Sequence, residues 1–216
     1  MDNPATTDSL WETMSTQRAI RYFRPDPIPD EVIWKVLDHT ICAPNGQNRQ
    51  AWSFVLVRDA ALRKRIAEHV ARTIGLQPAF KERVESGMRS QDRSTRLMMT
   101  GGKHLADHLD DAPVLVLPCI RGPYPEGMDR ILFGSAIYLA TQNLMLAARG
   151  MGLGTVMTSF QAGMLPELRE WLELPEDVLP VALIPMGYSD AKFGPLKREP
   201  PENATHWDRW GSRLSR

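Results

Sequence analysis

The sequence lacks any excess of charge, has almost no cysteine and contains no long apolar run. Over its 216 residues, 26 Lys and Arg balance 26 Asp and Glu, so bulk charge attracts neither nucleic acid nor an anionic membrane. The apolar runs fall far short of the roughly 18 residues that a membrane-spanning helix needs. We therefore expect neither nucleic acid nor a membrane as a partner.

The two cysteines, Cys42 and Cys119, form no Cys-x-x-Cys pair and are expected to be free thiols in a reducing compartment. Residues 1–7 lack the basic and apolar stretches of a secretory signal. Together these features predict a cytoplasmic protein. With 43% hydrophobic and 24% charged residues, the composition is that of an ordered chain, which we expect to form a single domain over residues 1–216.

Common catalytic and metal-binding motifs are also missing. His104 and His108 have the spacing of a zinc pair on a helix, but Leu105 replaces the glutamate of His-Glu-x-x-His, so no metal site is predicted. The segment 101–103 lacks the earlier glycine of a phosphate loop, and the glycines at 150–154 follow a helix instead of opening one, unlike a dinucleotide-binding turn. No nucleophile elbow is present. The sequence therefore shows no catalytic acid, base or nucleophile.

Apolar periodicity predicts helices interspersed with short apolar strands, which indicates an α/β or α+β protein with one sheet covered by helices. The run 112–119 is continuously apolar, as in a strand buried on both faces. The helix expected over 129–149 is apolar all round, which favours a central or interface position. Helices are expected at 8–18, 30–41, 59–74, 129–149 and 165–172, and strands at 53–57, 112–119, 155–158 and 181–186.

Two segments have weaker periodicity. Residues 75–103 are polar and arginine-rich and predict a helix plus a loop, which we interpret as a mobile lid over a site. Residues 190–216 form a polar tail that carries Trp207 and Trp210. Because tryptophans are rarely left free, the tail is expected to pack on the domain or on a partner subunit.

The candidate binding features are an amide-rich loop and three arginines. Residues 43–52 offer amides, backbone donors and a tight turn for holding a flat polar ligand; Trp52, which closes the loop, is expected to be a core anchor. Arg18, Arg21 and Arg198 suit bidentate contacts with a phosphate, although each alone is more often a surface salt-bridge residue. Together with the loop they predict a site for a phosphorylated planar ligand.

Six ordered motifs resemble those of the FMN-dependent nitroreductase family. They are Arg18-Ala19-Ile20-Arg21-x-Phe23, Pro27-Ile28-Pro29-Asp30-Glu31, Ala43-Pro44-x-Gly46-x-Asn48-x-Gln50-x-Trp52-x-Phe54, Gly152-Leu153-Gly154-Thr155, Pro185-x-Gly187-Tyr188 and Lys197-Arg198-x-Pro200. Each motif alone is weak, but the ordered set covers nearly the whole chain. The resemblance implies an α+β, nitroreductase-like fold with a central, mostly antiparallel sheet flanked by helices. It also implies an intertwined homodimer, with residues 75–111 as a variable insertion near the site and residues 190–216 packing on the dimer.

In this family two FMN sites lie at the dimer interface, and the resemblance implies which residues hold the cofactor. Arg18 and Arg21 would contact the phosphate, the ribityl chain and the pyrimidine edge of FMN. Arg198, with Lys197 beside it, would also contact the phosphate. The loop would approach the FMN of the partner subunit, and the strand end would lie along the ring. The implied cofactor-binding residues are Arg18, Ala19, Ile20, Arg21, Pro44, Asn45, Gly46, Asn48, Val156, Met157, Thr158, Lys197 and Arg198.

The sequence departs from the family pattern at four of these motif positions. Gln17 stands where many members have a first arginine, and Ala19 where many have serine. The phosphate then loses one charge and one hydroxyl, which should make Arg198 more important. Asn45 replaces a usual serine and is expected to change the contact near the flavin N5, while Ala51 replaces a usual proline and should relax the turn.

The resemblance implies an FMN-dependent NAD(P)H oxidoreductase that reduces nitroaromatic, quinone or similar small electrophilic acceptors by ping-pong hydride transfer. FMN would carry the chemistry, which agrees with the absence of an acid–base pair, and NADH or NADPH would donate the electrons. Two alternatives stay open. One is a flavoprotein of the same fold with another reaction, either reductive dehalogenation or flavin fragmentation; the other is a non-catalytic flavin-binding protein.

Overall fold

A computed structural model describes residues 6–75 and 78–213 of the chain. The expectations for residues 1–7, 75–111 and 190–216 therefore fall partly outside the described residues. The helices are α1 (Leu10–Thr16), α2 (Asp30–Thr40), α3 (Ala60–Gly75), α4 (Pro78–Met88), α5 (Arg93–Asp107), α6 (Met128–Gly150) and α7 (Leu165–Trp171). The strands are β1 (Trp52–Val57), β2 (Val114–Arg121), β3 (Gly154–Thr155), β4 (Val178–Pro180) and β5 (Ile184–Gly187), with short 3-10 helices at Gly46–Asn48, Leu109–Asp111, Phe160–Gly163 and Pro201–Asn203.

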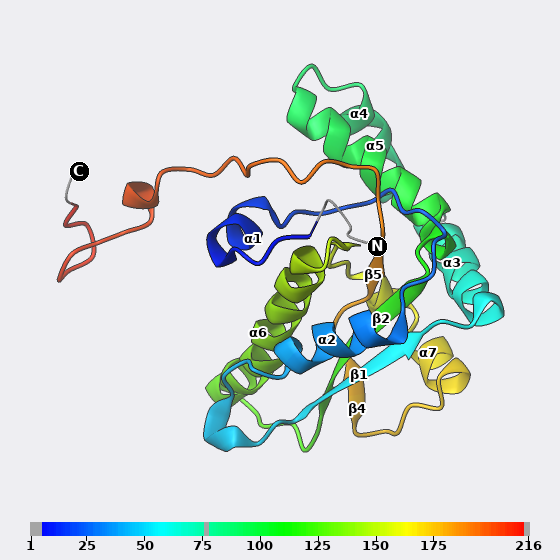
Figure 1. Ribbon diagram of the computed structural model, residues 1–216, viewed down its shortest axis with the longest axis horizontal. Coiled ribbons are helices and arrows are strands. Elements are labelled where there is room, and N and C mark those ends of the chain that lie inside the picture. Colours follow the sequence, from blue (N-terminus) through cyan, green and yellow to red (C-terminus); the bar gives the residue numbers. More distant parts are fainter. Residues whose placement is uncertain (1–5, 76–77, 214–216) are drawn as a thin grey trace.

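The five strands form one sheet in which every strand pair is antiparallel. The order is β1-β2-β5-β3, and β4 pairs with the far end of β2. β2 is the central strand, and residues Val114–Ile120 are all buried, which confirms the expectation of a strand buried on both faces. The expected α+β architecture, a mostly antiparallel sheet flanked by helices, is confirmed (Figure 1).

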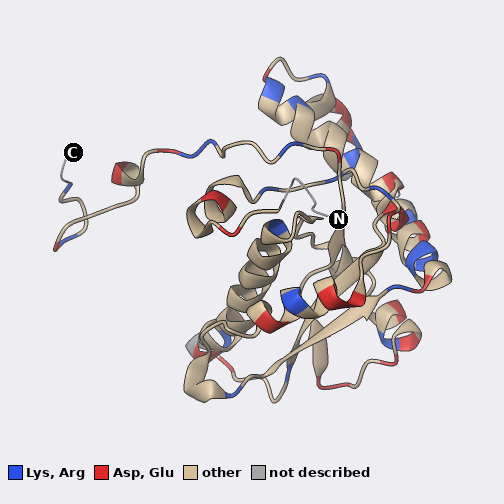
Figure 2. Cartoon of the chain, in the orientation of Figure 1, with Lys and Arg blue, Asp and Glu red and all other residues tan. Residues whose placement is uncertain are grey.

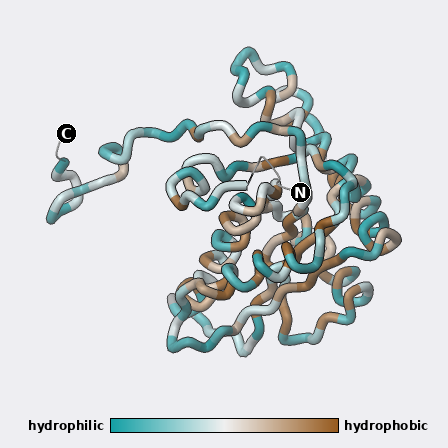
Figure 3. Tube along the Cα trace, in the orientation of Figure 1, coloured by the Kyte–Doolittle hydropathy of each residue, from teal (hydrophilic) through white to brown (hydrophobic). Residues whose placement is uncertain are grey.

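Alternate residues of β2 belong to two separate hydrophobic cores, one on each face of the sheet. Leu115 and Leu117 pack with apolar residues of α3, α5 and α7, whereas Val114 and Val116 pack with residues of α2 and α6. The sheet is thus the middle layer of three, and Figure 3 shows hydrophobic colour gathered along it. Figure 2 shows that charged residues lie mainly on the outer helices and along the C-terminal tail.

Helix α6 is buried on one side only. Ile137, Leu144 and Ala148 face the core, but Ile131 and Leu132 expose 67% and 65% of their surface. By length and composition alone α6 could also cross a membrane, but core helices of soluble proteins meet the same criteria. In this chain a third of the most apolar 18-residue stretch of α6 is buried. The exposed apolar side agrees with the expected central or interface position of this helix.

Two expected strands differ in extent from those observed. The strand expected over 181–186 is interrupted, because its residues pair with two different segments. Val181 N–H donates to Pro118 O in β2, whereas Leu183 forms an isolated bridge with Thr158. Only Ile184–Gly187 continues as β5, and the preceding strand β4 had no clear periodicity to reveal it. The expected strand at 155–158 likewise shortens to β3, with Thr158 rejoining the sheet by its single bridge.

Two segments project from the three layers. α4 and the adjoining first half of α5 form a helical hairpin that stands away from the sheet (Figure 1), whereas Leu105 and Ala106 near the end of α5 belong to the core. The stretch expected to be helix plus loop is therefore two helices, and the second is capped by Asp92, which accepts from Thr95 N–H. The C-terminal tail leaves the body past α1 and extends well beyond it (Figure 1). Trp207 and Trp210 on this tail are 53% and 91% exposed.

The segment after α1 joins the sheet next to β3. Ala19 forms a parallel bridge with Thr155, and Ile20 N–H donates to Thr155 O at 3.0 Å. Ile20 is buried against Gly154, where an added Cβ would lie only 2.6 Å from Ile20 Cγ2. Gly154 therefore permits the close approach that seats Ile20 in the core.

We predict that Gly154→Ala destabilises the protein by about 1–3 kcal/mol, because Ile20 is buried and backbone-bonded and cannot move aside freely. Thermal unfolding should show a melting temperature lower by roughly 2–4 °C per kcal/mol. Gly102→Ala is the matched control, since its Cβ would meet no atom within 4 Å in the middle of α5; it should raise stability by about 0.5–1 kcal/mol. Equal melting temperatures for Gly154→Ala and the unmodified protein would contradict the close packing.

Candidate functional site

Arg18 and Arg21 lie at the edge of the sheet, where the segment after α1 meets β3. Since Ile20 points into the core and its N–H is taken by Thr155, Arg18 and Arg21 flank a fixed backbone. Neither guanidinium has a hydrogen bond or an ion pair with any residue in the described part of the chain. Ala19, between them, is exposed and has no polar side chain to offer.

Arg21 lies partly buried against α5. A Cβ added at Gly101 would lie only 3.1 Å from Arg21 Cδ. Because glycine has no side chain, Gly101 leaves room for the aliphatic part of the arginine. Burial lowers the pKa of Arg21, the neighbouring Tyr22 raises it, and the positive charge of Arg18 lowers it further. The guanidinium is a partly desolvated cation with no counter-ion among residues 6–75 and 78–213, and an anion would stabilise it.

The tail brings two more basic residues to the same end of the molecule. Leu196 N–H donates to Ser15 O at 3.1 Å, directly before the arginine segment. A Cβ on Gly194 would lie 3.5 Å from Arg18 Nη1. Lys197 and Arg198 follow and are both exposed. Within the part of the chain that the structure describes, Arg198 Nη1 donates only to the carbonyl of its neighbour Lys197.

This course of the tail depends on a buried arginine at the end of α6. Arg149 is 4% exposed; its Nε donates to Thr16 Oγ1 at 2.9 Å and its Nη2 to Glu12 Oε1 at 3.2 Å. The guanidinium also stands 4.3 Å above the ring of Phe193 in the tail. Burial lowers the pKa of Arg149, and Glu12 raises it. Arg149 therefore ties α1, α6 and the tail together, a role that nothing in the local sequence indicates.

Beyond β3, the segment Val156–Thr158 continues along the same edge. Val156 is buried, and Thr158 is committed to Leu183, whose carbonyl accepts from both its N–H and its hydroxyl. Met157 between them is 48% exposed, and its N–H has no hydrogen-bond partner among the residues described. Met157 is therefore the residue of this edge whose amide is open to a ligand.

The predicted loop lies elsewhere, beside the first half of α6. Asn45 Oδ1 accepts from Gln50 N–H at 2.8 Å, so this side-chain oxygen closes the turn. Gln47, Asn48 and Gln50 have φ angles of 56°, 52° and 48°, a left-handed conformation uncommon outside glycine. Pro44, Gly46 and Asn48 are exposed, and Trp52 at the end of the loop is 8% exposed and belongs to a core cluster, as expected.

One chain thus holds the predicted residues in two groups at opposite ends of α6. The loop contacts residues near Phe133, whereas α1 and the arginine segment are tied to Arg149. Sixteen residues of helix separate these positions, on the order of 25 Å (Figure 1). The first group is Arg18, Ala19, Ile20, Arg21, Val156, Met157, Thr158, Lys197 and Arg198, and the second is Pro44, Asn45, Gly46 and Asn48.

Three aromatic rings, which the motif analysis did not place at a site, stack beside Arg21. The rings of Tyr22 and His104 lie 4.1 Å apart and those of His104 and His108 lie 4.6 Å apart. The pKa of His104 is lowered by burial and by the nearby His108. The two histidines therefore stack on each other and join α5 to the arginine segment.

Comparison with known proteins connects these features to a family. The sequence profile of the nitroreductase family matches residues 14–188. The iodotyrosine deiodinase of Danio rerio is 30% identical over 200 residues, which is 89% of this chain; this chain spans only 65% of that relative's length.

Two solved structures share the fold. The FMN-dependent nitroreductase NfnB from Mycobacterium smegmatis, in complex with NADPH, superposes with a TM-score of 0.69 at 20% identity, over 92% of this chain and 97% of that one. An oxidized iodotyrosine deiodinase bound to FMN and 3-iodo-L-tyrosine superposes with a TM-score of 0.67 at 21% identity, over 94% and 100% of the two chains. The chain has a nitroreductase-like fold, and because the family profile covers most of its length, the protein belongs to the nitroreductase family.

Proposed function

We propose that the protein is an FMN-dependent NAD(P)H oxidoreductase that reduces a small electrophilic acceptor, such as a nitroaromatic or a quinone. The observation that carries the proposal is the pair Arg18 and Arg21. Both guanidiniums lack an acceptor in the described part of the chain, and one of them is partly buried. Such a pair suits a phosphorylated ligand that also carries a flat polar ring.

The residues present fit FMN in charge and in donor type. Arg18, Lys197 and Arg198 would hold the phosphate, since the tail passes beside Arg18. Arg21 would stabilise negative charge at the pyrimidine edge, because its positive charge is partly desolvated and fixed in place by α5. The open N–H of Met157 would donate a hydrogen bond to the ring. When bound, FMN would supply the hydride chemistry that no side chain of this protein supplies.

A complete site would require a second copy of the chain. The loop that bears Asn45 and Asn48 lies beside the opposite end of α6 from the segment that bears the arginines, so in a homodimer it would serve the FMN of the partner. The exposed apolar side of α6, with Ile131 and Leu139, offers a surface for the second copy. The extended tail with Trp207 and Trp210 would pack on that copy as well.

The proposed electron donor and compartment rest on two other observations. The related structure of NfnB contains NADPH, which supports a nicotinamide donor. Cys42 is an exposed free thiol, which suits a reducing compartment such as the cytoplasm. The hairpin of α4 and α5 lies beside Arg21 through Gly101, so we assign it the role of a lid over the open side of the site.

The first test is the absorption spectrum of the purified protein after FMN is added. The expected result is a stoichiometric flavin spectrum that bleaches on addition of NADPH or NADH without oxygen and returns on addition of a nitroaromatic. A protein that takes up no FMN would exclude the proposal. Bound FMN that no nicotinamide reduces would instead identify a non-catalytic flavin-binding protein.

Reductive dehalogenation is the second candidate, because relatives of this chain include iodotyrosine deiodinases. In that reaction the carbon–iodine bond is replaced by carbon–hydrogen, which consumes two electrons and one proton and releases iodide. The same reduced enzyme, offered 3-iodo-L-tyrosine without oxygen, would then release iodide at a rate that exceeds nitro reduction. Absence of iodide together with rapid nitro reduction favours the first candidate, and release of a fragmented flavin under oxygen would point to neither.

The proposed role of Arg21 in FMN binding can be tested against the loss of a nearby arginine outside the site. Arg21→Met should weaken FMN binding by about 1.5–3 kcal/mol, the value of a hydrogen bond to a charged group. Arg24→Gln is the matched control three residues on, because that guanidinium already pairs with Asp26 at 2.8 Å and Asp190 at 3.2 Å. Equilibrium titration with FMN measures both. An unchanged dissociation constant for Arg21→Met would remove this residue from the site.

The two-chain site predicts complementation between defective subunits. One variant carries Arg21→Met, and the other carries Asn45→Ala with Asn48→Ala; each homodimer should bind FMN poorly. In a mixed dimer one of the two sites combines an intact loop with an intact arginine, so random reassembly should restore about a quarter of the normal sites. FMN titration after joint refolding measures the recovery. If the mixture binds no more FMN than the separate variants, the loop and the arginine do not share a site across subunits.

A further inference from the structure

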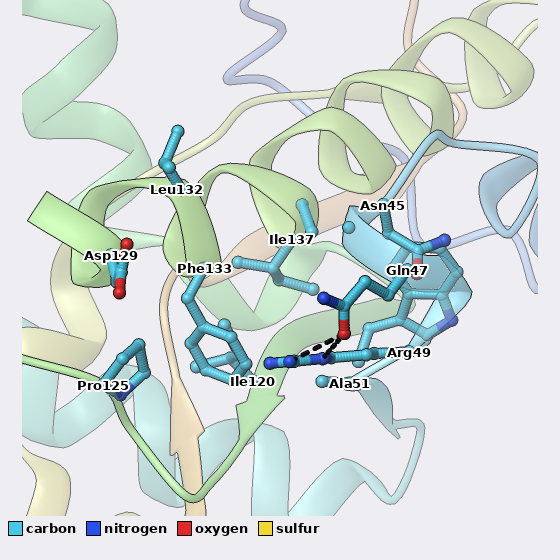
Figure 4. Close-up of a pocket in the computed structure, with 13 residues that line it drawn as sticks. Asn45, Gln47, Arg49, Ala51, Ile120, Pro125, Asp129, Leu132, Phe133 and Ile137 are labelled. Carbon is cyan, nitrogen blue, oxygen red and sulfur yellow. Dashed lines mark hydrogen bonds between the residues drawn. The ribbon is translucent and has the colours of Figure 1, made fainter.

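The loop side of α6 contains a cavity that is lined mainly by residues other than the proposed cofactor residues. It has a volume of about 320 Å³, the lower end of the range for small-molecule sites. Its walls are apolar where strand and helix side chains meet, and polar where the loop and the start of α6 form the rim (Figure 4). The apolar lining includes Trp52, Ile120, Leu132, Phe133 and Ile137, and the polar rim includes Asn45, Gln47, Arg49 and Asp129.

Arg49 is the positive charge of this rim, and it is held in position by a neighbour. Its Nε and Nη2 both donate to Gln47 Oε1, at 3.0 and 2.8 Å. In Figure 4 the side chain extends from the loop toward the side of Phe133. No carboxylate among the described residues pairs with it, so the remaining N–H donors of the guanidinium are available to a ligand.

The loop backbone fixes both members of this pair. Gln47 and Asn48 have left-handed φ angles, as does Gln50, a cost that persists only where the surroundings determine the conformation. The hydrogen bond from Gln50 N–H to Asn45 Oδ1 closes the turn around Arg49. The two hydrogen bonds to Gln47 restrict the guanidinium of Arg49, so less side-chain freedom would be lost on binding than for an arginine without such a contact.

We propose that this cavity binds the electron acceptor and that Arg49 selects planar aromatic acceptors that carry one carboxylate. This inference rests on the proposed function, because only there does the loop border the flavin of the partner subunit. The apolar walls around Phe133 would bury the ring, and the guanidinium would receive the carboxylate through two parallel hydrogen bonds. Asp129 on the other side of the rim disfavours a second anionic substituent, so the preferred acceptor is a monoanion of one ring.

The test compares two ligands that differ in charge and hardly in shape, 4-nitrobenzoate and 4-nitrobenzamide. Their dissociation constants are measured by calorimetry on the FMN-loaded protein without an electron donor, so that nothing reacts. The unmodified protein should bind 4-nitrobenzoate about tenfold more tightly, the low end for a charge-assisted contact at a partly open site. Arg49→Gln should remove this preference and leave the dissociation constant of 4-nitrobenzamide unchanged, which also shows that the cavity remains folded.

Three further variants sharpen the result. Arg49→Lys keeps the charge but not the planar fork, so it should retain only part of the preference. Asp129→Asn should tighten 4-nitrobenzoate binding a fewfold, because it removes a repulsive charge from the rim. Lys64→Gln, on the exposed side of α3, removes one positive charge far from the cavity and should change neither constant.

Equal binding of the two ligands by the unmodified protein, a preference that survives Arg49→Gln, or binding of neither ligand would each overturn the assignment of Arg49. These outcomes are distinct from failure of the proposed function, which would appear as absence of FMN uptake or of reduction by a nicotinamide. A protein that takes up FMN and reduces 4-nitrobenzamide, but binds 4-nitrobenzamide and 4-nitrobenzoate equally well, would keep its proposed function and lose this one.

Discussion

The hydrogen bond from Ile20 N–H to Thr155 O is the interaction on which the arrangement of the basic residues depends. The chain on its C-terminal side contains three prolines and has no regular structure of its own. By joining the sheet beside β3 and placing Ile20 over Gly154, this short bridge converts a flexible connection into a rigid one. Arg18 and Arg21 then project from a fixed backbone, so an anion that bound them would not also have to order the main chain.

Helix α6 imposes the second constraint. It is long enough to separate the two groups of predicted residues, and it is apolar on the side that a single chain leaves exposed. Both facts have the same cause, a helix of 23 residues that packs on the sheet along one side only. Arg149 at one end secures α1 and the tail, and Phe133 near the other end lines the cavity beside the loop. The helix is therefore both the structural support of each group and the reason that the groups lie apart.

The sequence predicted the parts of the fold that are governed by local periodicity. The continuous apolar run at 112–119 and the four-residue spacing of α3 gave the correct element types, with ends displaced by one or two residues. The short strand β4 was missed, because three residues are too few to show a period. The hairpin of α4 and α5 was only half recognised, since its polar composition resembles that of a loop.

The candidate site divides in the same way. The motifs that carry the resemblance predict the arginines and the loop as site residues, because those motifs are short-range patterns in the sequence. The sequence could not indicate that Arg149 is buried, that Gly101 makes room for Arg21 or that Tyr22 stacks on His104, because each contact joins segments that are distant in the chain. The left-handed residues of the loop were also hidden, since glutamine and asparagine fit many conformations and tertiary contacts decide among them.

The exposure of Met157 would affect the lifetime of the protein if it holds a reduced flavin, as proposed. Met157 is 48% exposed on the edge where its amide is open to a ligand. A reduced flavin that meets oxygen releases peroxide, and methionine is converted by peroxide to its sulfoxide, which is polar and reversible only by a dedicated reductase. In the function proposed above, oxidation of the reduced flavin by air would therefore convert Met157, the residue proposed to contact the ring, to its sulfoxide. The ageing of the catalyst would begin at the site that produces the oxidant.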